Sequence, residues 1–156
     1  MKSFRFVATG GTFDVLHKGH YALLSKAFQV GEHVIIGVTS DKFALNKKPN
    51  EKLTYRYSER VKNLERAISY KFGEVGYTIS KLDNIYGPTV LSNRVEAIVS
   101  SDETKSNASE INTIRKKNGL QPLKIITIPT VKSQDAIKIS SSRIRAGLID
   151  ADGKLI

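Results

Sequence analysis

Short apolar runs alternate with helical patterns along most of the chain. Five of these runs are rich in apolar residues and predict strands, at residues 4–9, 33–38, 75–80, 95–100 and 123–128. Between them, apolar residues recur at the three- and four-residue spacing of amphipathic helices, which predicts helices at 18–30, 54–72 and 104–118. A last helix is predicted to begin at Ser140, and Gly73, Gly119 and Gly147 stand where helices should end.

Strands that are apolar on both faces indicate a parallel sheet covered by helices on both sides. With right-handed crossovers, the expected fold is α/β: a Rossmann-like, doubly wound, five-stranded parallel sheet with helices on both faces. The lysine-rich stretch 39–52 contains Pro49 and is expected to be a loop, as is 84–89. Ligands of such folds bind at the carboxyl ends of the strands, where the polar segments of this chain also fall.

Composition narrows the class of protein. The 156 residues suffice for one domain, so 1–156 is expected to be a single domain. The net charge of +10 favours an anionic partner, but the basic residues are dispersed among acidic ones. The absence of cysteine excludes disulfides and thiol nucleophiles. No apolar run approaches a membrane span and no secretory signal is visible, so a cytoplasmic protein without a membrane partner is expected.

The segment from Gly10 to His20 reads GGTFDVLHKGH and joins the first strand to the first helix. A helix start collects unpaired N–H groups and the positive end of the helix dipole, and so favours phosphate. His17 and His20, two of the three histidines, are three residues apart and share one helix face. Thr12 can donate a hydroxyl. The glycines alone would fit a plain strand–turn–helix corner, but the whole string favours a phosphate chain as ligand.

A second segment of this kind is ISSSRIR at 139–145. Serine is a strong N-cap residue, and three serine hydroxyls with two arginine side chains form a second group of anion-binding donors. Taken alone, the segment would fit a capped surface helix equally well.

Together the two segments resemble the nucleotidyltransferase superfamily, whose members carry G-T-F-D-x-x-H-x-G-H and I-S-S-[ST]-x-I-R turns on a Rossmann-like sheet. Between them, LDNIYGPT at 82–89, VSSDET at 99–104 and INTIRKKNGL at 111–120 are similar to phosphopantetheine adenylyltransferase of the archaeal kind. That family is related to the adenylyltransferase domain of eukaryotic coenzyme A synthase. The resemblance implies that ATP and 4′-phosphopantetheine react to give dephospho-coenzyme A and pyrophosphate.

The resemblance also implies roles for residues. His20 should donate to the α-phosphate, His17 should contact the triphosphate beside it, and Lys42 should neutralise the acceptor phosphate, with Lys47 and Lys48 as rivals. The nucleotide-binding set is Gly11, Thr12, Phe13, His17, His20, Glu103, Ser140, Ser141, Ser142 and Arg145. The acceptor-binding set is Thr12, Lys42, Tyr86, Gly87 and Pro88.

The implied reaction needs no general base from the protein. The nucleophile is a phosphate oxygen that is already ionised at neutral pH, so alignment and charge stabilisation suffice. Mg²⁺ is expected with ATP, held mainly by phosphate oxygens, and no metal-ligating residue is assigned. Asp14 either supports the turn or meets a magnesium-bound water, and turn support is favoured.

Two alternatives stay open at this point. The end motifs read only the triphosphate, so a glycerol-phosphate cytidylyltransferase or an FMN or NMN adenylyltransferase would share them. A basic nucleic-acid-binding module is a different class, but no zinc-finger, aromatic or glycine-loop signature supports a nucleic-acid partner. The sequence leaves the oligomeric state open.

Overall fold

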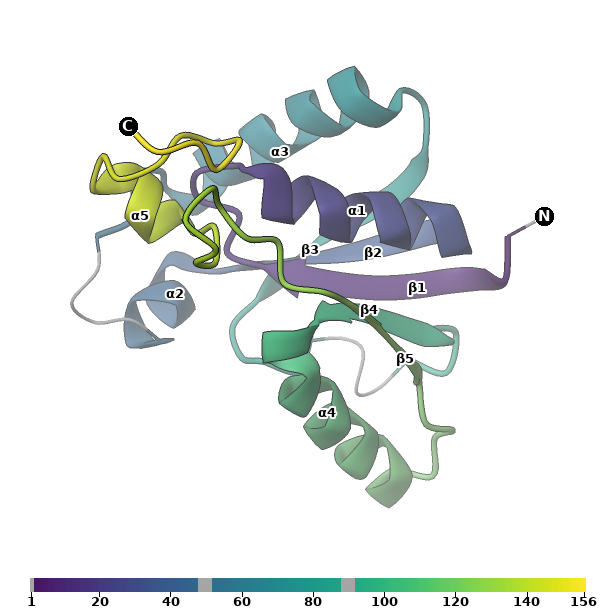
Figure 1. The fold of residues 1–156 in the computed structure, drawn as a ribbon. Coiled ribbons are helices and arrows are strands. Elements are labelled where there is room, and N and C mark those ends of the chain that lie inside the picture. The colour runs from purple at the N-terminus through teal and green to yellow at the C-terminus, as the bar shows by residue number, and fades with distance from the viewer. Residues whose placement is uncertain (1, 48–51, 88–91) are drawn as a thin grey trace.

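Five parallel strands form the centre of the computed structural model, which describes residues 2–47, 52–87 and 92–156 (Figure 1). The strands are β1 (Phe4–Gly11), β2 (Gly31–Thr39), β3 (Gly76–Leu82), β4 (Ala97–Ser101) and β5 (Lys124–Ile128). Their order is β3-β2-β1-β4-β5, and every neighbouring pair is parallel. The sheet therefore grows outward from β1 in both directions, which confirms the doubly wound, Rossmann-like α/β fold.

Helices cover both faces of the sheet. Helices α1 (Lys18–Val30) and α3 (Tyr57–Phe72) lie on one side, and α4 (Lys105–Lys117) lies on the other (Figure 1). Successive residues of a strand point to opposite faces, so Val7 packs into the core under α1 and α3 while Ala8 packs into the core with Ile111 of α4. Fully burying an aliphatic side chain such as Leu64 of α3 stabilises the fold by roughly 1.5–3 kcal/mol.

Helix α1 has the bounds that the sequence predicts, and the glycine stops are confirmed. Gly73, Gly119 and Gly147 follow α3, α4 and α5 (Ser141–Arg145) with φ of 71°, 75° and 75°. An L side chain is strained at such angles, so these glycines permit the chain to leave each helix.

Two expectations on the helices need correction. Residues 41–47, expected to be a loop, form helix α2 (Asp41–Lys47). The Ser40 hydroxyl accepts a hydrogen bond from the Phe43 N–H at 3.1 Å, and Ala44 is buried, so a cap and packing stabilise this short helix. Pro49, which was expected to prevent a helix there, lies outside the described residues. Helix α3 starts at Tyr57 rather than at 54 or 55, because the amides of those two residues bind a side chain from another segment, as shown below.

The 3-10 turn η2 (Asp102–Thr104) leads from β4 directly into α4, so the helix predicted to begin at 104 is confirmed. In the parts of the chain that the structure describes, no helix has both the length and the apolar character needed to cross a membrane.

Candidate active site

The two predicted anion-binding segments contact each other directly. The Ser141 hydroxyl donates to the Val15 carbonyl at 2.9 Å and lies 3.2 Å from the Val15 N–H, although these residues are 126 positions apart. The Arg145 guanidinium pairs with the Asp14 carboxylate. The starts of α1 and α5 are thereby held at the same edge of the sheet (Figure 1).

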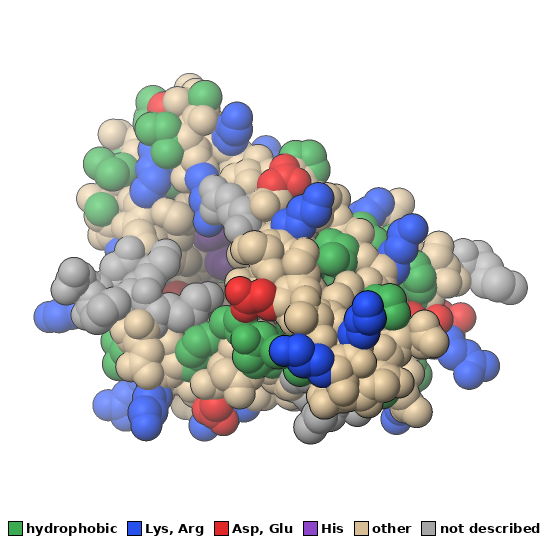
Figure 2. Space-filling view, turned by 90° about the horizontal axis from the view of Figure 1, so that it is seen from below, with side chains coloured by type: hydrophobic (Ala, Val, Ile, Leu, Met, Phe, Trp, Pro, Cys, Tyr) green, Lys and Arg blue, Asp and Glu red, His purple; other side chains and the backbone are tan. Residues whose placement is uncertain are grey.

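A cavity of about 440 Å³ lies between these helix starts and the carboxyl ends of β1, β2, β4 and β5. Figure 2 shows the hollow with histidine side chains at its bottom. Its wall includes most of the predicted nucleotide-binding residues: Gly11, Thr12, Phe13, His17, His20, Ser140, Ser141, Ser142 and Arg145.

The histidine pair is held by the first turn of α1. Nδ1 of His17, the N-cap residue, accepts from the Gly19 N–H at 3.0 Å, and Nδ1 of His20 accepts from the His17 N–H at 3.2 Å. The two rings stack with centroids 3.8 Å apart, and Phe13 packs on His20 at 5.0 Å. A neutral imidazole whose Nδ1 accepts a hydrogen bond carries its proton on Nε2, so each ring offers one Nε2–H donor.

Both histidines are held neutral. Burial, with a smaller effect from the Lys138 charge, lowers the pKa of His17 to about 4. Burial, then the charges of His17 and Lys138, lower the pKa of His20 well below its ordinary value. At neutral pH the pair therefore acts as two uncharged hydrogen-bond donors.

The lowered His17 pKa predicts that acid destabilises the fold. Unfolded His17 takes up its proton near pH 6.5 but folded His17 only near pH 4, so the unfolded state binds more protons between these values. Above pH 6.5 His17 is neutral in both states, and the free energy of unfolding keeps its full value. As the pH falls toward 4 that free energy falls by about 3 kcal/mol, at about 1.4 kcal/mol per pKa unit.

Urea unfolding followed from pH 7 to pH 4 measures this loss. His17→Asn keeps a side-chain oxygen at the N-cap but has no titrating ring, so its stability should depend less steeply on pH than that of the wild type. Parallel curves for the two proteins would contradict the assignment.

Asp14 connects three segments around the cavity and is 2% exposed. Its carboxylate oxygens accept from the Thr54 and Tyr55 amides, both at 2.9 Å, and from Arg145. Arg145 also donates to the Ser142 hydroxyl at 3.3 Å. Asp14 thus caps backbone N–H groups, but those of the segment before α3 rather than of its own turn, and it ties that segment and the start of α5 together.

Apart from Thr12, the described residues predicted to bind the acceptor are outside the cavity wall. Lys42 is exposed on α2 and is outside the cavity wall, because the helix turns Phe43 and Ala44 inward instead. Tyr86 lines a neighbouring hollow of about 50 Å³. The Asn84 side-chain oxygen accepts from the Tyr86 and Gly87 amides, both at 2.9 Å. Their roles in binding an acceptor stay predictions.

Four of the candidate residues cannot be placed in the site. Lys48 and Pro88 lie outside the described residues, as do the side chains of Lys47 and Glu103.

Sequence reasoning missed Lys138, Arg60 and Thr39, the last of which is buried and lines the cavity. Lys138 lines the cavity beside the histidines and directly precedes the ISSSRIR segment, a position that could have marked it. Arg60 of α3 is completely buried behind the cavity. Its helical spacing could have indicated that it is buried, because it stands four and eight residues before the core positions Leu64 and Ile68.

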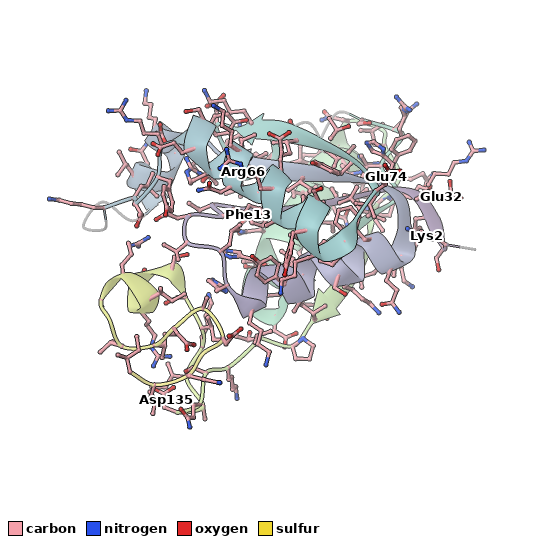
Figure 3. The ribbon with its side chains drawn as sticks, turned by 90° about the horizontal axis from the view of Figure 1, so that it is seen from above. Lys2, Phe13, Glu32, Arg66, Glu74 and Asp135 are labelled. Carbon is pink, nitrogen blue, oxygen red and sulfur yellow. The ribbon has the colours of Figure 1, made fainter. Side chains whose placement is uncertain are left out.

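Arg143 has a different place from its neighbour Arg145. It donates to the Ser133 hydroxyl at 2.8 Å and the Lys138 carbonyl at 3.0 Å, and pairs with Asp135. Asp135 lies at the outer part of the C-terminal segment (Figure 3). Arg143 therefore orders the loop that carries Lys138.

Comparison with known proteins agrees with this geometry. The model of the cytidylyltransferase-like family matches residues 8–147. The chain is 48% identical over 155 residues to phosphopantetheine adenylyltransferase of Methanothermobacter thermautotrophicus, covering 99% of this chain and 92% of that protein. Identity to the phosphopantetheine adenylyltransferase of Pyrococcus horikoshii is 49% over 157 residues, with 98% and 96% covered.

Among solved structures, a protein of unknown function from Archaeoglobus fulgidus is similar, with a TM-score of 0.68 and 34% identity over 79% of this chain and 97% of that chain. The chain therefore belongs to the cytidylyltransferase-like family of nucleotidyltransferases. Within this class, its relatives place it in the family of phosphopantetheine adenylyltransferases.

Proposed function

We propose that this protein transfers the adenylyl group of ATP to 4′-phosphopantetheine and releases pyrophosphate, forming dephospho-coenzyme A. The observation that carries the proposal is the meeting of two helix starts, one with a neutral histidine pair and one with three serines, at a single cavity. The near-full-length identity to phosphopantetheine adenylyltransferases supports the choice of acceptor. A reaction that uses ATP also favours the cytoplasm as its location.

In this proposal the triphosphate lies between the two helix starts. The helix start and Ser140, Ser141 and Ser142 of α5 surround the β- and γ-phosphates, with Arg145 beside them. The Ser141 hydroxyl already bonds to the Val15 backbone, so it serves chiefly to hold the two segments together. The histidine Nε2–H donors then face the α-phosphate.

The chemical step is a displacement at the α-phosphorus. A phosphate oxygen of the acceptor forms the new P–O bond, and the bond from the α-phosphorus to the oxygen shared with the β-phosphate breaks. The nucleophile enters and pyrophosphate leaves as anions, so the histidines need not give up or take a proton. Two fixed neutral donors stabilise the charge on the α-phosphate oxygens without having to be desolvated during the reaction.

We also propose that Mg²⁺ arrives with ATP and is held mainly by phosphate oxygens. The donor set favours this view, because both Asp14 oxygens already accept hydrogen bonds from the protein. The described residues hold no group of three or more acidic, histidine or cysteine side chains placed to bind a metal. When bound, the ion would offset negative charge on the polyphosphate.

A panel of acceptors tests the function. Pyrophosphate release is measured with ATP and 4′-phosphopantetheine, pantetheine, FMN or NMN, and with CTP and glycerol 3-phosphate. We expect kcat/KM for 4′-phosphopantetheine to exceed that for pantetheine by at least about 100-fold, since the charged phosphate is both nucleophile and binding group. It should also exceed the values for the other acceptors that carry a phosphate, as the identity to phosphopantetheine adenylyltransferases suggests. Faster turnover with any other pair would replace this proposal by that activity.

A further inference from the structure

Arg60, which is buried behind the cavity, begins a continuous chain of hydrogen bonds that passes through Thr39 and ends at Thr12. Nη1 of Arg60 lies 2.8 Å from the Thr39 carbonyl and 3.4 Å from the Thr39 hydroxyl. The Thr39 hydroxyl in turn donates to the Thr12 hydroxyl at 3.1 Å. Arg60 and Thr39 are buried, with 0% and 2% exposure, and both Thr39 and Thr12 line the cavity.

The other bonds of Arg60 fix its guanidinium in place. Nη1 also donates to the Thr12 carbonyl at 2.8 Å, Nε donates to the Tyr55 carbonyl at 3.1 Å, and Nη2 pairs with Asp41 at 2.8 Å. One side chain of α3 thereby joins the carboxyl ends of β1 and β2 to the starts of α2 and α3.

The chemistry of these groups gives the chain a direction. A guanidinium only donates hydrogen bonds, whereas a threonine hydroxyl has one hydrogen to donate and lone pairs to accept. The two Nη1 hydrogens of Arg60 go mainly to the Thr39 and Thr12 carbonyls at 2.8 Å, and the Thr39 hydroxyl gives its single hydrogen to the Thr12 hydroxyl. The Thr12 oxygen is then an acceptor on that side, and its own hydrogen is directed elsewhere.

We propose that Arg60 and Thr39 are positioning residues that hold the Thr12 hydroxyl as a hydrogen-bond donor toward a substrate phosphate oxygen in the cavity. This inference rests on the proposed function, in which Thr12 meets the acceptor phosphate. A hydroxyl held in this orientation suits an anionic oxygen, which only accepts. It disfavours an uncharged acceptor whose hydroxyl would have to donate to Thr12.

Thr39→Val tests the proposal, because it keeps the shape of the side chain and removes the donor. We expect kcat/KM for 4′-phosphopantetheine to fall about tenfold, the size expected for one hydrogen bond to a charged group. Thr39→Ser should restore most of the loss. The matched control is Thr9→Val: Thr9 is also buried, donates its hydroxyl to the Val99 carbonyl at 2.9 Å and is outside the cavity wall. Its kinetics should stay within twofold of the wild type.

A double-mutant cycle separates positioning from a general loss of structure. In a Thr12→Val background the relay has no end point, so adding Thr39→Val should change kcat/KM by less than twofold. An unchanged Thr39→Val enzyme, or the same tenfold loss in both backgrounds, would overturn the proposal. If Thr39→Val folds poorly, Thr39→Ala is used in the same cycle. A wild-type protein inactive with 4′-phosphopantetheine would instead refute the proposed function, so the two failures are distinct.

Discussion

Replacing His20 with alanine should lower kcat at least about 100-fold, the cost of losing one preorganised donor to developing charge. The ring lies at the bottom of the cavity, neutral, with its proton on Nε2. Its Nδ1 bond to the His17 amide is also lost, which should cost about 1 kcal/mol and lower Tm by only about 2–4 °C. Steady-state kinetics and thermal unfolding of the same preparation measure both effects.

Two variants serve as comparisons. His20→Asn keeps an oxygen that can accept from the His17 amide but has no Nε2–H, so its stability should recover while its turnover stays low. His33→Ala removes the third histidine, which contacts Thr78 at 2.7 Å. Its neighbour Glu32 lies at the end of the sheet opposite α5 (Figure 3). His33→Ala should therefore keep wild-type turnover, and an active His20→Asn enzyme would refute the role of the Nε2 donor.

Asp14→Ala should lower the free energy of unfolding by about 3 kcal/mol, because it leaves the Arg145 charge and two backbone amides without their partner. Arg145 is 22% exposed, so water offsets part of the cost that a fully buried pair would show. For a protein of this size, Tm should fall by about 6–12 °C. ATP affinity measured by calorimetry should also fall, since Asp14 holds Arg145 at the cavity.

The control for this variant is Asp135→Ala, which removes the partner of Arg143 at the outer part of the C-terminal segment. Both side chains of that pair reach water, so its loss should lower Tm much less than Asp14→Ala does. If Asp14→Ala were as mild as Asp135→Ala, the buried carboxylate would not be the link between the two predicted phosphate-binding segments.

Local signals in the sequence were sufficient for most of the fold. Runs rich in apolar residues predicted all five strands, and helical spacing with a turn motif predicted α1 over 18–30. They failed at α2, because a helix of seven residues has too few periodic positions to stand out and depends on the Ser40 cap and on burial of Ala44. They also missed the start of α3, because Asp14, 40 residues earlier, binds the amides of Thr54 and Tyr55.

For the candidate site, too, some features follow from the sequence and others from the tertiary structure alone. The sequence by itself determined the sheet, the two segments proposed to bind phosphate and the family, because backbone preferences and motif spacing are properties of neighbouring residues. The tertiary structure alone decided that these segments meet, that Arg60 is buried behind Thr12, and that both histidines stay neutral. Those outcomes depend on burial and on contacts between residues up to 131 positions apart, and no local pattern records them.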